Sequence, residues 1–548
     1  MKNIIKLLSN IKLNNWAMVL CFVLIIGSIL LSQFIKELHS GEPLQEFDVF
    51  KQIPKIENLR AYENNLNDSS VIAQKIRPLY QWFTTLFAKR GNGKVVIGKN
   101  GWLFYRPSID YIIKPAFAFD RDMGPLPAII AFHETLKAQG VDLILLPVPG
   151  KATIYPEYLS KRYKMDSGPP DNFHAAEFFN QLRDNGITVL NPEKMLWYEK
   201  AKNTEPLYIK QDTHWSPLGM DIVAQLLAQT IKNGKWLTGV PQRSYNIQSM
   251  KVTNFGDLYD MLNLPWSNSF NPINIKIDKV IDVKTKKPCI SDSKSPIILL
   301  GDSFVNVSSK EEMKWGDHGG FSEHLALHLG VPIDVIAINN GGASISRESL
   351  ARRPDALVGK KLVIWQFVTR DLVNPESNWN IVRIPPPSKK EIKPVNQNVA
   401  KAIEPTKDVE KERSKEELAV EDASAEKTLT QDEKKSEEQK LTITAEVIKV
   451  SMVPDPSQVA YTECLTYIKY RVIAVEHGEY KNQELLAVFW GMKDSKLMPA
   501  ARFKVGEKQR LVLDPFDNHE ELSHIMQADD TNDYESIPFW VLKMSYLN

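Results

Sequence analysis

Three residue types that together support acyl transfer occur in two short segments of the chain. The segment "IKQDTHWSPLGM" carries Asp212 and His214, and "SPIILLGDSFVNVS" carries Ser303 directly after an apolar run. On a strand, residues two apart share a face, so a strand-like segment would present this carboxylate and imidazole side by side. A serine hydroxyl needs a neutral imidazole to take its proton, and a carboxylate holds that imidazole in the right tautomer. We therefore expect Ser303 as nucleophile, His214 as base and Asp212 as the carboxylate that orients the base.

The position of Ser303 in its segment supports this expectation. A serine that follows a buried strand lies at the carboxyl end of that strand, where open α/β sheets bind ligands. Gly301 permits a tight turn there, and the first amides of a following helix would face an oxyanion. We interpret the adjacent Asp302 as a turn or helix-cap residue, because neighbours in sequence rarely face each other across a turn.

The elements around these residues alternate between strands and helices from about Gly98 to Trp379. Helical spacing of apolar residues alternates with near-continuous apolar runs of strand length. Such runs are typical of parallel strands that are buried on both faces. The pattern predicts an α/β domain with a parallel central sheet, preceded by a hairpin that turns at Asn100 and Gly101. The predicted strands lie in residues 141–149, 187–192, 295–304, 331–339 and 361–367.

The N-terminal segment has the composition of a membrane anchor. An apolar run from Trp16 to Ile35 follows three lysines and has about the length that a bilayer-spanning helix needs. The positive-inside rule would leave the rest of the chain outside the cytoplasm. A cleaved signal peptide is the alternative, but "SQFIKELHS" offers no small-x-small cleavage site. We expect residues 1–35 to be a cytoplasmic tail and transmembrane anchor, followed by a helical stalk over 36–95.

The C-terminal part changes composition twice. Prolines and dense mixed charge begin near Pro385 and predict a charged, disordered linker over 384–440, which cannot bury enough surface to offset ordering. Short strands separated by turn residues begin at Leu441 and predict a small β-barrel or sandwich over 441–548. This small all-β domain would bind carbohydrate, dock to a partner, or do neither.

Composition excludes several classes of protein and site. The net charge of +1 offers no general reason for nucleic-acid binding. Three widely separated cysteines exclude a disulfide framework and a cysteine zinc site, and a single bridge between Cys289 and Cys464 is disfavoured. His324 and His328 have metal-ligand spacing on a predicted helix, but no third ligand is evident in the sequence. We therefore predict helix-surface histidines, no metal site and no cofactor.

A family resemblance joins these segments. "GWLFY", "PVPGKATIYPE", "DTHWSP", "LLGDSF" and "VIWQF" followed by Arg370 resemble, in this order, the alginate O-acetyltransferase family of SGNH hydrolase-like proteins, the AlgX and AlgJ type. The resemblance implies an SGNH-like domain over 96–383 that transfers acetyl groups to hydroxyls of an exopolysaccharide such as alginate. It implies a multi-pass membrane-bound O-acyltransferase as acetyl donor, and a location at the inner membrane with the bulk in the periplasm. By position, Ser303, His214 and Asp212 again become nucleophile, base and orienter.

The same resemblance suggests further site residues. The SGNH pattern uses a glycine amide and an asparagine side chain as oxyanion donors, and "INNGGAS" offers Gly341, Gly342, Asn339 and Asn340 without a choice among them. A flexible turn is the alternative interpretation of this segment.

Four larger side chains are candidates for substrate binding. Trp215 and Trp102 would stack on sugar faces or simply pack in the core. Lys151 and Arg370, at the same edge of the predicted sheet, would contact an acidic sugar or be solvated.

Three functions fit these residues. The first is a membrane-anchored O-acetyltransferase, the second a carbohydrate acetyl esterase of the same fold, and the third a non-catalytic polysaccharide-binding or assembly component. All three triad residue types are present, which disfavours the third. Transfer and hydrolysis differ in how well the acyl intermediate is shielded from water, which is a matter of geometry.

Overall fold

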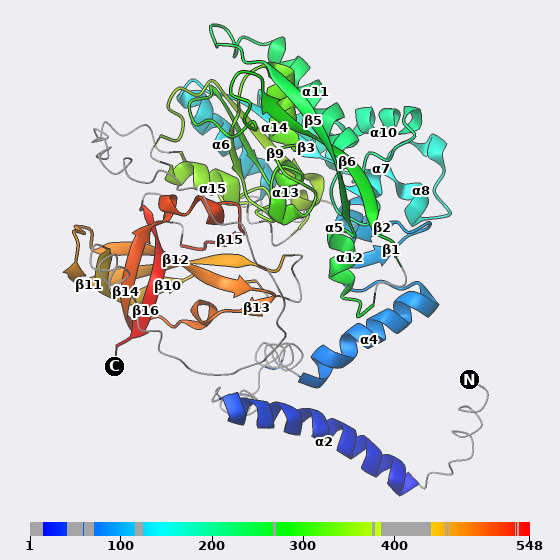
Figure 1. Ribbon diagram of the computed structural model, residues 1–548, viewed down its shortest axis with the longest axis vertical. Helices are drawn as coiled ribbons and strands as arrows, with labels where there is room; N and C mark the ends of the chain where they lie inside the picture. Colours follow the sequence, from blue (N-terminus) through cyan, green and yellow to red (C-terminus); the bar gives the residue numbers. More distant parts are fainter. Residues whose placement is uncertain are drawn as a thin grey trace, which may run out of the picture.

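The structure is a computed structural model with two folded domains that lie against each other (Figure 1). It describes residues 15–40, 59, 71–114, 124–266, 270–353, 355–374, 377, 379–384, 440–454, 456, 459, 461–531, 533 and 536–547. An α/β domain contains the parallel sheet, and a β domain follows it in the chain. The predicted linker, except for its first and last residues, lies outside the described residues.

A parallel sheet forms the centre of the α/β domain. Its order is β4 (Thr188–Val189), β3 (Asp142–Val148), β9 (Leu362–Val368), β7 (Ile297–Gly301) and β8 (Asp334–Ala337), and every neighbouring pair is parallel. The last strand in sequence, β9, therefore lies in the middle of the sheet. The prediction of an α/β domain with a parallel central sheet is confirmed.

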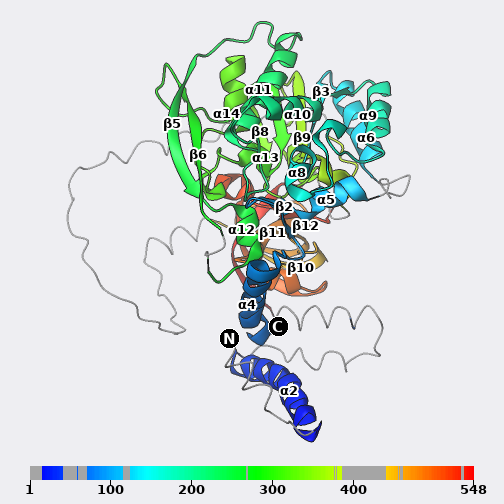
Figure 2. The same cartoon turned by 90° about the vertical axis from the view of Figure 1, so that its right-hand side faces the viewer.

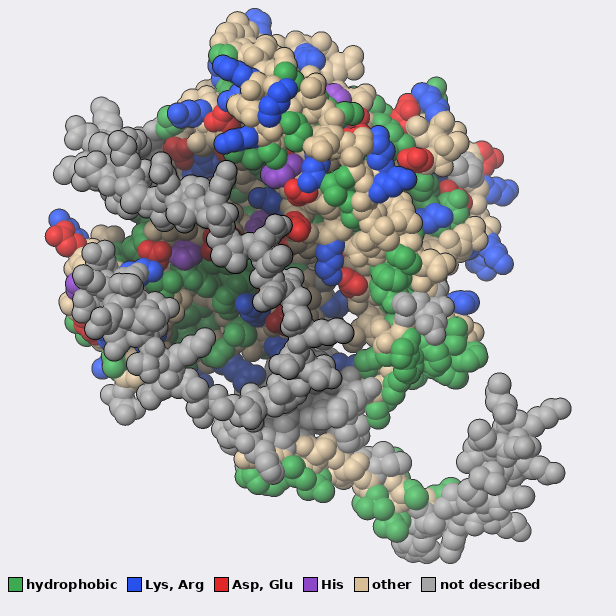
Figure 3. Space-filling view, viewed as in Figure 1, with side chains coloured by type: hydrophobic (Ala, Val, Ile, Leu, Met, Phe, Trp, Pro, Cys, Tyr) green, Lys and Arg blue, Asp and Glu red, His purple; other side chains and the backbone are tan. Residues whose placement is uncertain are grey.

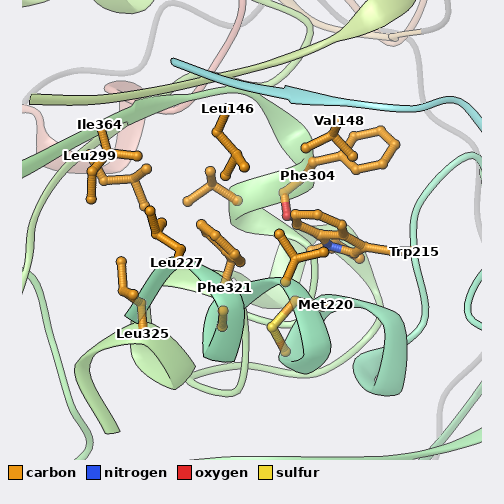
Figure 4. Packing of buried hydrophobic residues seen from close by; sticks show 14 of the residues in the cluster. Leu146, Val148, Trp215, Met220, Leu227, Leu299, Phe304, Phe321, Leu325 and Ile364 are labelled. Carbon is orange, nitrogen blue, oxygen red and sulfur yellow. Dashed lines mark hydrogen bonds between the residues drawn. The ribbon is translucent and has the colours of Figure 1, made fainter. Parts of the chain in front are cut away.

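Both faces of the sheet are covered by helices, and successive strand residues enter opposite cores. Ile144 and Leu146 of β3 pack with helices α11 (Pro217–Lys232) and α14 (Phe321–Leu329). Leu143 and Leu145 pack with α6 (Pro125–Ala138), α9 (Ala175–Asp184) and α15 (Ile345–Arg352) on the other face. Figure 4 shows part of the first core. Because side chains alternate along a strand, burial of both faces requires the near-continuous apolar runs found in the sequence.

Smaller elements surround this sheet. The predicted hairpin forms from β1 (Val95–Ile97) and β2 (Leu103–Tyr105), and β5 (Tyr245–Asn254) pairs with β6 (Ile273–Asp282) in a long ribbon at the edge of the domain (Figure 2). The sequence pattern did not predict the ribbon, because most β5 side chains are exposed and polar residues interrupt the apolar pattern. The remaining helices of the domain include α5 (Arg106–Ile113), α7 (Lys151–Ile154), α8 (Pro156–Leu159), α10 (Glu193–Lys202), α12 (Asp257–Leu262) and α13 (Ser303–Asn306).

The β domain is a small closed barrel. Strand β10 (Leu441–Val450) pairs with β11 (Cys464–His477), β11 with β12 (Glu484–Lys493), β12 with β16 (Pro538–Tyr546), β16 with β14 (Lys508–Pro515), and β14 again with β10. Closure leaves no free edge in this ring of strands. Of the two predicted alternatives, the barrel is therefore the one that forms.

A buried ion pair joins the two domains. The guanidinium of Arg352, at the end of α15, contacts the carboxylate of Asp529, and both side chains are almost completely buried. A second contact joins His524 Nε2 to Glu312 Oε1 at 2.9 Å. The barrel therefore docks on the α/β domain through one buried ion pair and one partly exposed contact.

We expect Arg352→Ala to lower the free energy of unfolding by about 3–5 kcal/mol, because it leaves the Asp529 carboxylate buried without its cation. The shift in the midpoint of denaturant unfolding measures this loss. Arg471→Ala is the matched control, because Arg471 pairs with Glu446 at 3.5 Å and its side chain is 62% exposed. Its cost should stay below about 1 kcal/mol. If the two variants lose the same unfolding free energy, the stabilising role of the buried pair is contradicted.

The N-terminal region forms helices but does not support the predicted membrane span. Trp16 to Ile35 lie within α2 (Asn15–Ser40), and the predicted stalk contains α4 (Val71–Ala88). A span needs both length and sustained apolar character, and no helix among the described residues has both. Helix α4 exposes several apolar side chains, which gather on one visible surface in Figure 3: Ile76, Leu79, Tyr80, Phe83 and Phe87.

The cysteines form no bridge. Cys289 is buried in the α/β domain, Cys464 is buried in the barrel, and all three cysteines are free thiols.

Candidate active site

The structure brings Ser303, His214 and Asp212 into one hydrogen-bonded chain. His214 Nε2 lies 2.8 Å from Ser303 Oγ, and His214 Nδ1 lies 2.6 Å from Asp212 Oδ1. All three side chains are buried, with at most 5% exposure. A carboxylate only accepts hydrogen bonds, so Nδ1 carries the hydrogen and the neutral ring presents the Nε2 lone pair to the serine hydroxyl. This arrangement can remove the Ser303 proton as the hydroxyl attacks a carbonyl.

Ser303 is positioned by the turn between β7 and α13. The Asp302 side chain caps α13 by accepting a hydrogen bond from the Phe304 amide at 2.8 Å, which is the predicted cap role. Gly301 ends β7 where a side chain would collide with Val305 and with the Gln366 side chain. The strand therefore passes closely beneath α13, and Ser303 begins the helix at the carboxyl edge of the sheet.

The segment that carries Asp212 and His214 is a tight loop, so the expectation of a strand is wrong. The loop is closed by hydrogen bonds from Ile209 N to His214 O and from Ser216 N to Leu207 O, at 3.1 and 2.9 Å. Asp212 Oδ1 also accepts from the amide of His214 at 3.0 Å. The two side chains therefore meet through a side-chain-to-backbone turn. Hydrogen bonds of the loop backbone and of the Asp212 side chain replace the sheet pairing that the alternation suggested.

Two residues that the sequence analysis missed complete the surroundings of Asp212. Its Oδ2 accepts from Trp315 Nε1 at 2.8 Å and from the amide of Asp257 at 2.9 Å. Asp257 Oδ1 in turn accepts from the amide of Thr213 at 2.6 Å. Trp315 is 103 positions from Asp212 in the sequence, so no local sequence pattern could have predicted this contact.

These contacts set the charge states in the site. Burial opposes ionisation of Asp212, but the positive charge and hydrogen bond of His214, with the bonds from Trp315 and the Asp257 amide, lower its pKa. Burial also disfavours the imidazolium of His214, but the Asp212 carboxylate outweighs it and raises the pKa of His214 above 6.5. Burial, and then the charge of Asp212, raise the pKa of Asp257 to about 6. Asp212 is therefore the ionised carboxylate beside the base.

Lys151 lies beneath this loop, so it is not available to an acidic sugar. Its side chain is buried, and its ammonium donates to the backbone oxygens of Ile209, Lys210 and Asp212. Burial lowers the pKa of Lys151 to about 7, against the raising effect of the Asp212 and Asp257 carboxylates. The residue anchors the loop that carries the base and its carboxylate.

We expect Lys151→Met to lower activity by about ten- to a hundredfold, because methionine fills similar space but cannot donate the hydrogen bonds that tie three loop carbonyls to one ammonium. The unfolding free energy should fall by about 2–4 kcal/mol. Turnover and denaturant unfolding, measured on the same preparation, test both values. Lys161→Met, which changes an exposed lysine, is the control. Wild-type turnover in Lys151→Met would contradict the anchoring role.

The two tryptophans predicted as sugar-stacking candidates are core residues. Trp102 is 2% exposed and packs on Tyr155 and Tyr158 with ring centroids 4.5 Å apart. Trp215 is 1% exposed and donates its Nε1 hydrogen to the Phe304 carbonyl at 3.0 Å. Figure 4 shows Trp215 beside Phe304 in the core. A buried indole face cannot contact a polymer, so neither residue binds sugar in this way.

Arg370 does lie at the edge of the site. Its guanidinium is 5.4 Å from the ring centre of Tyr105 and 5.6 Å from that of Phe304, the residue after the nucleophile. It lines a pocket between the two domains together with Asp302 and with Met452 and Tyr461 of the β domain. A role in binding substrate stays a prediction for Arg370.

The predicted oxyanion residues occupy different positions in one loop. The Gly341 amide donates to Ile338 O at 3.0 Å, so it serves a turn of its own. The backbone N–H of Asn339 donates a hydrogen bond to His524 O of the barrel at 2.8 Å. The side-chain Oδ1 of Asn339 accepts a hydrogen bond from Asn306 Nδ2 at 2.8 Å. Asn340 and Gly342 have positive φ angles of 59° and 53° and line the interdomain pocket with Asp302. The choice of donor stays a prediction.

Comparison with known proteins places this domain in a family. Residues 95–369, just over half of the 548-residue chain, match the family model described as "SGNH hydrolase-like domain, acetyltransferase AlgX". The matched range contains Asp212, His214 and Ser303.

Several relatives carry a related name. A probable alginate O-acetylase AlgJ of Pseudomonas fluorescens is 29% identical over 225 residues, which cover 39% of this chain and 54% of the relative. That of Pseudomonas aeruginosa is 27% identical over 296 residues, covering 53% and 72%. The solved O-acetyltransferase domain of Pseudomonas putida AlgJ is 25% identical, covers 52% of this chain and 94% of that domain, and has a TM-score of 0.41.

The chain spans about half the length of the first two AlgJ relatives that it matches. The family model, in contrast, covers more than half of this chain and includes Asp212, His214 and Ser303. The chain therefore belongs to the family of SGNH hydrolase-like domains of the acetyltransferase AlgX type.

Proposed function

We propose that this protein is an O-acetyltransferase that carries an acetyl group on Ser303 and passes it to a hydroxyl of an alginate-like exopolysaccharide. The observation that carries the proposal is the hydrogen-bonded chain from Ser303 Oγ through His214 to Asp212, with contacts of 2.8 and 2.6 Å. It lies within a domain of an acetyltransferase family. The acceptor class rests on the relatives named as alginate O-acetylases.

In the first half of the reaction, Ser303 Oγ attacks the carbonyl carbon of an acetyl ester while His214 Nε2 takes the hydroxyl proton. The ester bond of the donor breaks, and His214 returns the proton to the departing alcohol. Ser303 is then an acetyl ester. In the second half, a sugar hydroxyl gives its proton to His214 and attacks the acetyl carbonyl. The serine oxygen leaves and regains the proton from His214.

Burial of the triad supports transfer over hydrolysis. Exposures of 2–5% for the three side chains limit the access of bulk water to the acyl intermediate. A bound sugar hydroxyl would then compete well against water, because it is held next to the base.

The test is product analysis with the purified full-length chain, an acetyl-ester donor and alginate oligosaccharides, read by mass spectrometry. Acetylated oligosaccharides that Ser303→Ala does not form would support the proposal. Free acetate alone would identify an esterase. Absence of both products, with oligosaccharide binding retained, would favour the non-catalytic alternative.

We also propose that the folded domains work in the periplasm and receive acetyl groups from a multi-pass membrane-bound O-acyltransferase at the inner membrane. The family resemblance and the apolar N-terminal sequence support this location. An alkaline phosphatase fusion at the C-terminus should be active, whereas a fused cytoplasmic reporter would be silent. Deleting the acyltransferase partner should abolish polymer acetylation in cells while the purified chain still uses a synthetic donor.

A further inference from the structure

A histidine pair and a carboxylate meet on two packed helices away from Ser303. His324 and His328 lie on α14, and Asp221 lies on α11. Asp221 Oδ1 is 2.7 Å from His324 Nδ1 and 2.6 Å from His328 Nε2. The sequence showed the histidine spacing without a third ligand, and the packing of α11 against α14 supplies one. The proposed acetyl transfer uses none of these residues.

Two of the three side chains, Asp221 and His324, have a further hydrogen-bond partner. Residues four apart on a helix share a face, which brings the two imidazoles together. Gln225, one turn after Asp221, donates to Asp221 Oδ2 at 2.8 Å and leaves Oδ1 to the histidines. His324 Nε2 lies 3.0 Å from the backbone oxygen of Asp278. Partners of this kind, on the far side of a ligand, are what metal-binding histidines and carboxylates have in proteins.

The hydrogen positions around His324 favour a cation between the three groups. A backbone carbonyl only accepts, so His324 Nε2 carries a hydrogen. In the neutral ring, Nδ1 then presents a lone pair toward Asp221 Oδ1, which is also an acceptor. Asp221 Oδ1 also lies 2.6 Å from His328 Nε2. Either an extra proton or a metal ion must lie between these atoms.

We propose that Asp221, His324 and His328 form a binding site for a divalent transition metal, with Zn²⁺ as the probe. Two imidazole nitrogens and one carboxylate oxygen are ligands that Zn²⁺ accepts at about 2.0–2.2 Å. Tetrahedral binding at that length separates ligand atoms by about 3.3 Å. The ligand atoms all lie within 4.8 Å of one another. A small rotation of the side chains therefore suffices.

The exposure of the ligands leaves room for a further ligand. The side chains of Asp221 and His328 are 26% and 24% exposed, whereas that of His324 is 7% exposed. A fourth position on the ion would thus face solvent and hold water, as in sites with three protein ligands.

A metal at this position would clamp the helices that pack behind Ser303. Helix α11 begins three residues after His214, and α14 begins at Phe321, whose ring packs on Trp215 with centroids 5.2 Å apart. Trp215 in turn donates a hydrogen bond to the Phe304 carbonyl. The bound ion would stabilise the folded domain by mass action and leave the reacting atoms untouched.

The test is zinc binding by the tag-free, full-length chain after treatment with a chelator. Isothermal titration with ZnCl₂ should give about one site per chain in the micromolar range or tighter, and the melting temperature should rise by about 3 °C or more at saturating zinc. Folded wild-type chain that binds no Zn²⁺ and no Co²⁺ would overturn the proposal.

Variants locate the site. His328→Gln and Asp221→Asn should each weaken Zn²⁺ binding at least tenfold, while His174→Gln, which changes a histidine on the far side of the sheet, should leave it unchanged. Near-ultraviolet circular dichroism checks folding. The visible absorption of Co²⁺ in the wild-type chain reports nitrogen and oxygen ligation without any mutation. Undiminished zinc binding in both folded variants would place the ion elsewhere and overturn the assignment.

Discussion

Ser303→Ala should lower acetyl transfer by about four orders of magnitude or more while leaving the fold intact. The substitution removes the hydroxyl that carries the acetyl group in the proposed reaction, so the residual rate comes from binding and electrostatics. Alanine fits without strain because Ser303 begins α13 and its helix cap comes from Asp302. Initial rates of acetyl-ester turnover and of oligosaccharide acetylation both measure the loss.

A second serine provides the comparison. Ser322 is also buried, and its Oγ contacts Glu323 Oε2 at 3.0 Å rather than His214. Ser322→Ala should keep activity within about twofold of the wild type. Mass spectrometry of wild-type chain quenched during turnover should locate a +acetyl adduct on the peptide with Ser303. Retained acetylation in a folded Ser303→Ala variant would end the assignment of this nucleophile.

Asp212→Asn should lower turnover by about three to four orders of magnitude. Both carboxylate oxygens of Asp212 accept hydrogen bonds, one from His214 and the other from Trp315 and the Asp257 amide. An asparagine must turn its NH₂ group toward one of these donor sets. If it faces His214, Nδ1 must accept, the hydrogen moves to Nε2, and the ring can no longer take the serine proton.

The same variant should change the pH dependence of the reaction. The base works only when neutral, so wild-type activity should fall as pH drops through the His214 pKa, which lies above 6.5 because of Asp212. Removing the carboxylate removes the effect that raises this pKa, so the acidic limb should move to lower pH. The pH profile of kcat/KM measures this limb.

Asp260→Asn is the matched control for this variant, because Asp260 is half exposed and pairs only with Lys314 in the contacts described. It should leave the rate and the profile unchanged. If the acidic limb of the kcat/KM profile lies at the same pH in Asp212→Asn as in the wild type, a group other than His214 determines that limb.

The residues around the site show where prediction from sequence succeeds. Apolar runs predicted β3, β7 and β9 because a strand buried on both faces must be apolar at nearly every position. The position of Ser303 follows from the end of such a run. Asp302 was recognisable as a cap because capping is a contact between residues two apart.

Other residues show where such prediction fails. Lysine and tryptophan are common at binding surfaces. Here, however, the ammonium of Lys151 is buried against three backbone carbonyls, and the ring of Trp102 is buried against two tyrosine rings. The alternation of Asp212 and His214 resembled a strand, whereas the loop is closed by its own hydrogen bonds. A loop that is held by side-chain-to-backbone hydrogen bonds can have the same alternation of residues as a strand, so the sequence pattern does not distinguish the two.

The sequence by itself determined the α/β class, the strand that delivers Ser303, the change to an all-β domain after the charged segment, and the residue types of the triad. These properties follow from local periodicity and turn chemistry, which act over a few positions. The tertiary structure alone decided that Trp315 and Asp257 hold Asp212, that Lys151 lies beneath the loop, and that Asp221 meets two histidines. Such contacts join segments many positions apart, and their geometry depends on how whole helices and strands pack.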